Sequence, residues 1–462
     1  MPEHLVDRAP AGAIPIEPIP EGGLERWLVG QDTVARAWVA ANAYKAKPGR
    51  HLLIPDEAGK LAAVALGVTG ETDIWSYGDL PMALPDGVYR LPDAMESESA
   101  TAAALGWALG GYGFDRYKKR DRKPARLALP RAADKEQVRR EAAAIFLVRD
   151  LINTPAEDMG PAELAEAARK VAKAGGAKFS AIVGPDLLKR NYPCIHIVGR
   201  ASSRAPRLID LRWGRRGPKV TLVGKGVCFD SGGLDLKASN YMLTMKKDMG
   251  GAAHVLGLAQ MIMAAGLEVR LRVLIPAVEN SVSANAYRPL DIVRSRKGLT
   301  VEIGNTDAEG RVILCDALAE AETEKPDLLI DIATLTGAAR VALGPDLPAL
   351  FANDDLVAEA ALKHGKTVDD PLWRLPLHKP YRKLIDSKIA DINNAGDSAF
   401  AGAITAALFL ADFVDPATRW LHLDVMAWNP TARPGRPVGA EAVAIRALYA
   451  LIADQAGSRR KK

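Results

Sequence analysis

The stretch Lys219-Val-Thr-Leu-Val-Gly-Lys-Gly-Val-Cys-Phe-Asp-Ser-Gly-Gly-Leu-Asp-Leu-Lys237 joins a β-rich apolar run to a glycine-rich loop. Glycines let the backbone turn tightly, so the loop can bring together Lys225, Asp230 and Lys237. It lacks the third glycine of a dinucleotide fingerprint, the Ser or Thr after Gly-Lys of a phosphate-binding loop, and the glycine that precedes Ser231 in a nucleophile elbow. Because open α/β sheets bind ligands beyond the carboxyl ends of their strands, we expect a site here.

Helical and strand patterns alternate on both sides of this stretch. They predict helices at 99–109, 135–153, 161–174, 249–265 and 312–322. They predict strands at 178–183, 195–199, 208–213, 219–223, 269–278 and 328–333, whereas 51–55 and 61–66 are short mixed segments. This alternation indicates the α/β class, with a smaller N-terminal α/β domain and a larger C-terminal α/β domain whose mixed central sheet is flanked by helices. We place the domains at residues 1–130 and 155–462, with a linker helix at 131–154.

A second chemically informative segment is Asn305-Thr-Asp-Ala-Glu-Gly-Arg311, in which Asp307, Glu309 and Arg311 are each two residues apart. In extended backbone, alternate side chains point the same way, so these three groups can converge on one point. Two carboxylates at one point repel each other unless a cation lies between them. The segment also fits a capping box in which Thr306 and Glu309 begin a helix, and the two interpretations are compatible.

A further acid occurs in Met242-Leu-Thr-Met-Lys-Lys-Asp-Met-Gly-Gly-Ala-Ala-His254, where Asp248 lies at or near a helix N-terminus. Taken singly, each charged residue named so far fits an ordinary role as a surface lysine, a turn former or a first-turn acid. We expect His254 to pack within its helix and not to bind a metal. Four carboxylates together exceed the needs of one ion pair, and they suit Mg, Mn, Zn or Co, with room for two metals: Asp230, Asp248, Asp307 and Glu309.

The composition bounds the class of protein. With 462 residues, 48% hydrophobic and 25% charged, the chain is expected to be globular, and a net charge of +5 does not argue for a dedicated nucleic-acid binder. Three scattered cysteines indicate neither a disulfide framework nor a zinc knuckle: Cys194, Cys228 and Cys315. Such usage suits a reducing cytoplasm, and we find no signal peptide or membrane span.

Basic residues gather at 116–126 and in the tail 459–462. We expect the first to be a solvated interdomain linker and the tail to be disordered. A patch for nucleic acid is the alternative for these segments, so a DNA-binding or regulatory protein is a second function class. Retention on DNA that weakens with salt would separate it from a plain enzyme.

The sequence resembles the leucyl aminopeptidase family of dinuclear metallopeptidases. The resemblance covers about residues 149–445. Besides the two segments quoted first, it rests on Met245-Lys-Lys-Asp-Met249, Ala286-Tyr-Arg-Pro289, Ala333-Thr-Leu-Thr-Gly-Ala338 and Ile389-Ala-Asp-Ile-Asn393. Tyr192-Pro-Cys-Ile-His196 resembles a bacterial, peptidase B-like subgroup. The N-terminal part resembles the family's variable accessory domain, which makes the C-terminal domain the catalytic one.

This resemblance implies two divalent metal ions per subunit, Mn or Zn first, with Co or Mg as alternatives. The positions that match metal ligands are Lys225, Asp230, Asp248, Asp307 and Glu309, of which Asp230 and Glu309 match the bridging pair. Lys225 must bind as a neutral amine. A metal-bridging hydroxide is the implied nucleophile. Lys237 and Arg311 match the catalytic residues, with Lys237 stabilising an oxyanion and Arg311 holding a bicarbonate that shuttles the proton.

The implied activity is removal of the N-terminal residue from short peptides by a cytoplasmic homohexamer. The matching side-chain pocket suits Leu, Met or apolar residues broadly, and its residues are Met245, Thr334, Leu335 through its backbone, Gly337 and Met426. The chain departs from the family at three places. Met426 replaces a small residue, Ala427 stands where a glycine follows, and Leu290 replaces a glycine.

Overall fold

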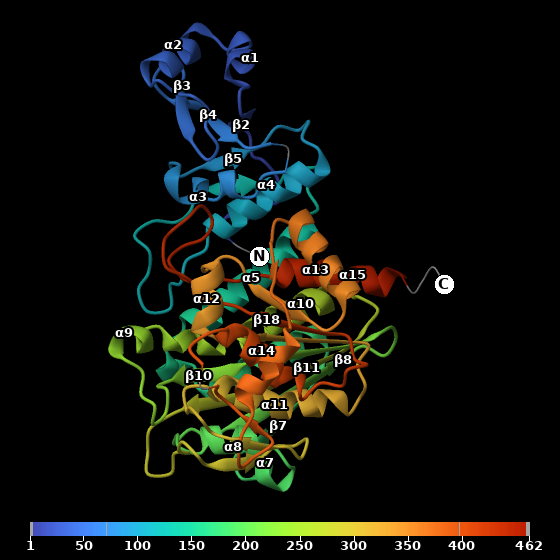
Figure 1. Ribbon diagram of the computed structural model, residues 1–462. Coiled ribbons are helices and arrows are strands. Elements are labelled where there is room, and N and C mark those ends of the chain that lie inside the picture. Colours follow the sequence, from blue (N-terminus) through green and yellow to red (C-terminus); the bar gives the residue numbers. More distant parts are fainter. Residues whose placement is uncertain (1–2, 71, 397, 459–462) are drawn as a thin grey trace. The chain divides into compact units, whose positions relative to one another are not determined.

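The computed structural model describes residues 3–70, 72–396 and 398–458, which form two compact units (Figure 1). The first unit comprises residues 1–146 and 429–438, and the second comprises 147–428 and 439–462. Each unit contains its own β-sheet together with helices, which confirms the predicted α/β class. Within the described ranges, no helix is long and apolar enough to cross a membrane.

The first unit is built on six strands: β1 (Leu5–Val6), β2 (Ile14–Pro20), β3 (His51–Pro55), β4 (Leu61–Val68), β5 (Val88–Arg90) and β6 (Arg126–Ala128). Their order in the sheet is β1-β6-β5-β2-β4-β3, and only β3 and β4 pair antiparallel. The helices are α1 (Leu24–Val29), α2 (Thr33–Ala41), η1 (Trp75–Tyr77), α3 (Leu80–Ala83) and α4 (Ser97–Gly110). The core includes Trp107 of α4, whose ring packs 5.9 Å from that of Tyr89.

The basic segment 116–126 lies between α4 and β6 inside the first unit, so its prediction as an interdomain linker is wrong. Its residues 116–123 are exposed, as predicted, and Arg120 pairs with Asp115 at 2.9 Å. The predicted helix α5 (Lys135–Asn153) continues from the first unit into the second across the boundary at residues 146 and 147. The basic tail 459–462 lies outside the described residues.

The second unit contains a nine-stranded mixed sheet. Its strands are β7 (Lys178–Val183), β8 (Arg207–Trp213), β9 (Lys219–Gly224), β10 (Gly226–Asp230), β11 (Arg270–Asn280), β14 (Leu328–Ala333), β15 (Ala349–Ala352), β16 (Trp373–Arg374) and β18 (Trp420–Asp424). The order is β16-β15-β18-β14-β9-β11-β8-β7, and β10 pairs with β11. The central strands β18, β14, β9 and β11 run parallel, so their carboxyl ends share one edge.

Two groups of helices pack against this sheet. In one group, α10 (Gly250–Ala264) contacts α6 (Pro161–Gly175) and α15 (Ile445–Ser458), and α15 contacts α13 (Asp355–Thr367). In the other, α11 (Glu309–Glu322) contacts α8 (Pro193–Gly199) and α14 (Gly402–Ala411), and α14 contacts α12 (Gly337–Leu343). Both α10 and α11 contact β9 and β11. All six residues of β14 are buried, as is typical of strands covered on both faces.

The remaining elements are short: η2 (Ala156–Asp158), α7 (Asp186–Lys189), α9 (Ser239–Met242), η3 (Met245–Met249), η4 (Lys379–Ile385), β12 (Ile292–Arg294), β13 (Thr300–Glu302), β17 (Ile392–Asn393), β19 (Trp428–Asn429) and β20 (Gly439–Ala440).

One predicted strand is wrong, because residues 195–199 belong to the helix α8. Pro193 stands in its first turn, and the N–H groups of Cys194 and Ile195 donate to the carboxylate of Asp316. This distant cap outweighs the strand preference of the β-branched residues.

Candidate metal centre

The segments that carry the predicted ligands meet at the carboxyl edge of the sheet in the second unit. Lys225 follows β9 directly, Asp230 ends β10, and Asp248 lies in η3 just before α10. Asp307 stands in the turn before α11, and Glu309 is the first residue of that helix. We call these five residues the ligand cluster.

Lys225 is the centre of one half of the ligand cluster. Its Nζ lies 2.7 Å from Asp248 Oδ2 and 2.8 Å from Glu309 Oε1. The same amine donates to the backbone oxygen of Thr334 at 3.0 Å. Lys225, Asp248 and Glu309 are all buried.

Lys237 closes the other half, with its Nζ 2.8 Å from Asp230 Oδ2 and 2.5 Å from Asp307 Oδ1. Asp230, Asp307 and Glu309 each offer an oxygen within 4.8 Å of the others. The structure therefore brings together all five predicted ligands and the predicted catalytic lysine.

The ligand cluster fits divalent cations by its hydrogen bonding. Three of its buried oxygens accept no hydrogen bond from a described residue: Asp248 Oδ2, Asp307 Oδ1 and Glu309 Oε1. They touch the lysine ammonium groups as ion pairs without hydrogen-bond geometry. Buried acceptors normally accept hydrogen bonds, so these oxygens retain capacity to bind a cation. Carboxylate oxygens with one amine form a donor set that divalent cations accept.

The pKa values of the cluster reflect burial of several acids together. Burial and then the charge of Asp230 raise the pKa of Asp307 to about 6, and the same two causes raise the pKa of Glu309 well above its usual range. Burial opposes the charge on Lys225, but the surrounding carboxylates, Asp248 first, raise its pKa overall. A divalent cation would reverse these shifts, because it favours the ionised acids and the neutral amine.

A layer of neutral hydrogen bonds holds the acids in place. Asn280 Nδ2 donates to Asp230 Oδ1 at 2.9 Å and to the Thr306 carbonyl at 3.0 Å, and the Tyr287 hydroxyl donates to the same carbonyl at 2.6 Å. The Thr306 hydroxyl donates to the Gly232 carbonyl and accepts the N–H of Asp235, so it does not cap α11. The predicted capping box is therefore wrong, although the predicted helix forms. Asn280 carried no sequence signal, whereas Tyr287 lies in a motif quoted above.

Arg311 is buried on α11 and donates through Nη1 to the backbone oxygen of Asn394 at 2.8 Å. Burial lowers its pKa to about 10. Asn394 in turn accepts the N–H groups of Gly304 and Asn305, so it ties Arg311 to the turn that carries the acids. Sequence reasoning missed Asn394.

The predicted pocket residues lie in η3 and just after the strands β14 and β18. The Thr334 hydroxyl donates to Asp248 Oδ1 at 2.7 Å, so this residue joins the pocket to the ligand cluster. Met245 is buried in η3, Gly337 is exposed at the start of α12, and Met426 is half-buried just after β18. The N–H of Leu335 donates elsewhere, to the carboxylate of Asp424.

Two of the departures from the family pattern place a side chain where the backbone conformation favours glycine. Leu290 and Ala427 have φ angles of 70° and 56°, in the left-handed region where glycine has no steric cost. The Cβ of Ala427 lies 2.6 Å from where a Cβ on Gly250 would stand, so this side chain in turn requires a glycine at the start of α10.

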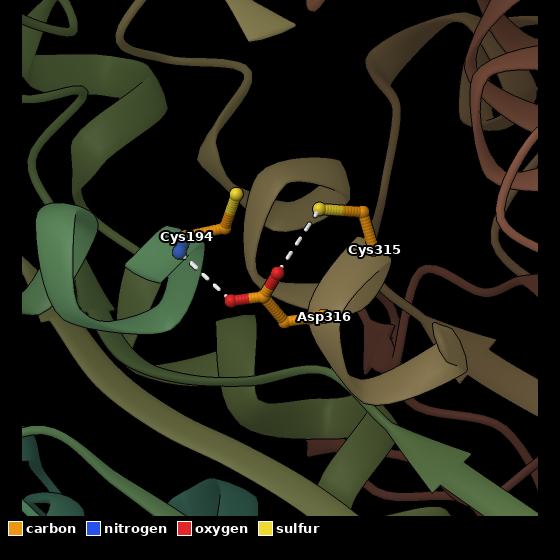
Figure 2. A group of neighbouring side chains, drawn as sticks. All are labelled: Cys194, Cys315 and Asp316. Carbon is orange, nitrogen blue, oxygen red and sulfur yellow. Dashed lines mark hydrogen bonds between the residues drawn. The ribbon is translucent and has the colours of Figure 1, made fainter. Parts of the chain in front are cut away.

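His254 packs within α10 as predicted, with Nδ1 2.6 Å from the Gly250 carbonyl. The three cysteines are free and buried. Two of them form a second group of possible metal ligands, the thiol cluster of Cys194, Cys315 and Asp316, whose ligand atoms lie within 4.8 Å of one another (Figure 2). Here the carboxylate is satisfied, because it accepts the N–H groups of Cys194, Ile195 and Arg296.

Comparison with known proteins gives one family from sequence and from structure. Residues 146–449 match the cytosol aminopeptidase family, catalytic domain, and residues 14–130 match the M17 aminopeptidase N-terminal domain. Peptidase B of Cronobacter sakazakii is 42% identical over 331 residues, which cover 69% of this chain and 77% of that protein.

Two solved structures are similar over nearly the whole chain. The cytosol aminopeptidase of Coxiella burnetii has a TM-score of 0.95 at 51% identity and covers 98% of this chain and 99% of its own. The bottromycin maturation enzyme BotP in complex with Mn has a TM-score of 0.87 at 33% identity, covering 96% of this chain and all (100%) of its own.

Proposed function

The chain belongs to the cytosol aminopeptidase family and is a metal-dependent aminopeptidase, and from this premise we propose that it binds two divalent metal ions and removes the first residue of short peptides with a metal-bridging hydroxide as nucleophile. The observation that carries the two-metal proposal is the set of three buried carboxylate oxygens that accept no hydrogen bond from a described residue. Four carboxylates share only two lysine ammonium groups at this place, so cations would supply the positive charge that the lysines do not.

The ligand cluster divides naturally between two ions. Asp230 and Glu309 would bridge both, Lys225 and Asp248 would complete one, and Asp307 would complete the other. The pairing of Lys225 with Asp248 and Glu309 at 2.7 and 2.8 Å supports this division. When bound, the ions supply Lewis acidity, which polarises a carbonyl group and lowers the pKa of water enough to provide hydroxide near neutral pH. Manganese or zinc is our first choice, with cobalt or magnesium as alternatives.

Lys237 and Arg311 would act on the substrate. The amine of Lys237 is held by Asp230 and Asp307, so it stands beside the ligand cluster with its pKa raised by those charges against the effect of burial. A cation held there would stabilise negative charge that develops on the scissile carbonyl oxygen. Arg311 keeps an unpartnered Nε among the described residues, which leaves part of its planar guanidinium for a small anion such as bicarbonate.

Apolar first residues suit the pocket of Met245, Thr334, Gly337 and Met426. A second candidate is an acidic first residue, and a specific observation favours it. Arg340 Nη2 lies 3.8 Å from where a Cβ on Gly337 would stand.

A second nitrogen near Arg340 adds to this case. Lys247 is buried, and burial lowers its pKa to about 8, with the charges of Asp248 and Arg340 also acting on it. Neither Lys247 nor Arg340 forms an ion pair with a described residue, so no carboxylate in direct contact neutralises their charges.

Leucyl and glutamyl p-nitroanilides separate the two candidates. If the apolar lining determines specificity for the first residue, the leucyl substrate has the higher kcat/KM, and Met426→Ala allows bulkier first residues to be cleaved. If Arg340 decides, the glutamyl substrate is preferred, and Arg340→Gln reduces that preference by roughly tenfold. An unchanged preference in Arg340→Gln excludes the acidic candidate.

We also propose a cytoplasmic homohexamer, for which light scattering is the test. The main experiment is a screen of aminoacyl amides with chelated protein, restored separately with Mn, Zn, Co and Mg. Activity should vanish on chelation and return with at least one metal, both in wild type and in Glu322→Gln, a control at the far end of α11. Activity that survives chelation would refute the proposal.

A further inference from the structure

Among the described residues, the Asp424 carboxylate bonds to Leu335 and Thr336 and not to a proposed ligand, yet it lies at the sheet edge where the ligands gather. It is the last residue of β18, which pairs in parallel with β14 so that Asp424 stands opposite Ala333. The chain after Ala333 makes the turn of residues 334–337, which carries three predicted pocket residues. Because β14 and β18 end together, Asp424 is placed directly beside this turn.

The carboxylate of Asp424 is buried, and both of its oxygens accept hydrogen bonds from this turn. Its Oδ1 accepts the N–H of Leu335 at 2.9 Å and the N–H of Thr336 at 3.2 Å. Its Oδ2 accepts the Thr336 hydroxyl at 2.6 Å, and that hydroxyl oxygen also accepts the N–H of Ala339 at the start of α12. One side chain therefore fixes two successive peptide groups and the helix that follows.

These two bonds decide where the carbonyl groups of the turn point. In a trans peptide the C=O and N–H of one plane point in opposite directions, and the described chain has no cis peptide. With the N–H of Leu335 held by Asp424, the carbonyl of Thr334 points the other way and accepts from Lys225 Nζ at 3.0 Å. With the N–H of Thr336 held likewise, the carbonyl of Leu335 is also directed away from Asp424.

From this geometry we propose that Asp424 is a positioning residue, which aims the Thr334 carbonyl at the amine of Lys225 and the Leu335 carbonyl at the N-terminal part of the bound peptide. The inference rests on the proposed function, because it assumes that Lys225 is a metal ligand and that Leu335 contacts substrate. Hydrogen-bond partners of metal ligands orient them, and their loss typically lowers metal affinity or activity by about 10–100-fold.

The test compares Asp424→Ala with Asp370→Ala. Asp370 is a matched control, since its buried carboxylate likewise accepts backbone N–H groups, those of Ala444 and Arg446, but at the start of α15. Both variants lose a buried cap and should lose similar thermal stability. Only Asp424→Ala should raise KM for leucyl p-nitroanilide and the Mn concentration for half-maximal activity, each by roughly tenfold or more.

Asp424→Asn should recover most of the loss, because its amide oxygen can still accept both N–H groups. If Asp424→Ala does not fold, Asp424→Ser is measured by the same criteria, since it keeps one acceptor in the buried position. Unchanged KM and metal requirement in the folded variant would overturn the positioning role. If wild-type protein shows no metal-dependent hydrolysis, the proposed function itself fails, and the two failures are thus distinguishable.

Discussion

The ligand cluster and the thiol cluster look alike as lists of atoms but differ in how their acids are satisfied. Each offers three possible metal ligands within 4.8 Å of one another. In the ligand cluster, three buried carboxylate oxygens accept no hydrogen bond from a described residue. In the thiol cluster, the carboxylate accepts three backbone N–H groups and thereby caps α8. Proximity of donors is therefore a weak indicator of a metal site, and unsatisfied acceptors are the better one.

The largest expected effect comes from Glu309→Gln. An amide cannot supply the negative charge that a bridging position needs, so the variant should lose metal and lower kcat/KM by more than roughly 100-fold. Metal content by mass spectrometry and hydrolysis of leucyl p-nitroanilide are the measurements, with circular dichroism to check the fold. Full turnover by this variant would remove the ligand cluster from the mechanism.

Asp316→Ala should lower the stability of the fold without affecting metal binding or activity. It leaves three N–H groups without their acceptor, those of Cys194 and Ile195 in buried positions, so the free energy of unfolding should fall by about 1–3 kcal/mol in urea titrations. Metal content and KM should stay at their wild-type values, since the thiol cluster holds no metal in this account. Loss of bound metal in Asp316→Ala would break the comparison.

A pH series separates the ligand cluster from the thiol cluster by a second, independent readout. The pKa values of Asp307 and Asp316 are both raised to about 6, mainly by burial. A raised folded-state pKa stabilises the fold below the unfolded value near 4, and this contribution is lost as pH rises through about 6.

A metal ion would replace the proton at Asp307 but not at Asp316. The gain in melting temperature from added Mn should therefore grow between pH 5 and pH 7 and vanish in Glu309→Gln. A gain that is independent of pH would contradict the proton displacement.

The smallest effect is expected for Cys315→Ala. The thiol donates only to the Val312 carbonyl within its own helix and, more weakly, to Asp316. Its removal should cost on the order of 1 kcal/mol of stability and leave activity unchanged. Activity lost in Cys315→Ala would mean that the thiol cluster contributes to the site.

The sequence was sufficient where the information is local. Patterns of apolar residues predicted the helices α4, α5, α6, α10 and α11 and the strands β7, β8, β9, β11 and β14, and three motif segments contained all five residues of the ligand cluster. The prediction of a strand at 195–199 was wrong, because the cap that makes these residues helical comes from Asp316, about 120 residues later in the chain. The prediction of an interdomain linker at 116–126 was wrong, because a run of charged residues indicates solvent exposure but not the unit to which a loop belongs.

The residues that support the site could not be predicted either, because their partners are also distant in the sequence. Asn280 and Asp424 end strands that are neighbours of the motif segments only in the folded sheet, and Asn394 lies about 80 residues beyond the Arg311 that it binds. Their types are common at strand ends and turns, so nothing in the linear pattern sets them apart. Strand order and register supply the missing information.

The most direct test of the central claim is anomalous diffraction from crystals of the Mn-loaded protein. Our account predicts two peaks per chain, both bounded by Asp230 and Glu309, with Lys225 and Asp248 beside one and Asp307 beside the other. No peak is expected at Cys194 and Cys315. A map with no density between these carboxylates, or with manganese bound elsewhere, would contradict the account.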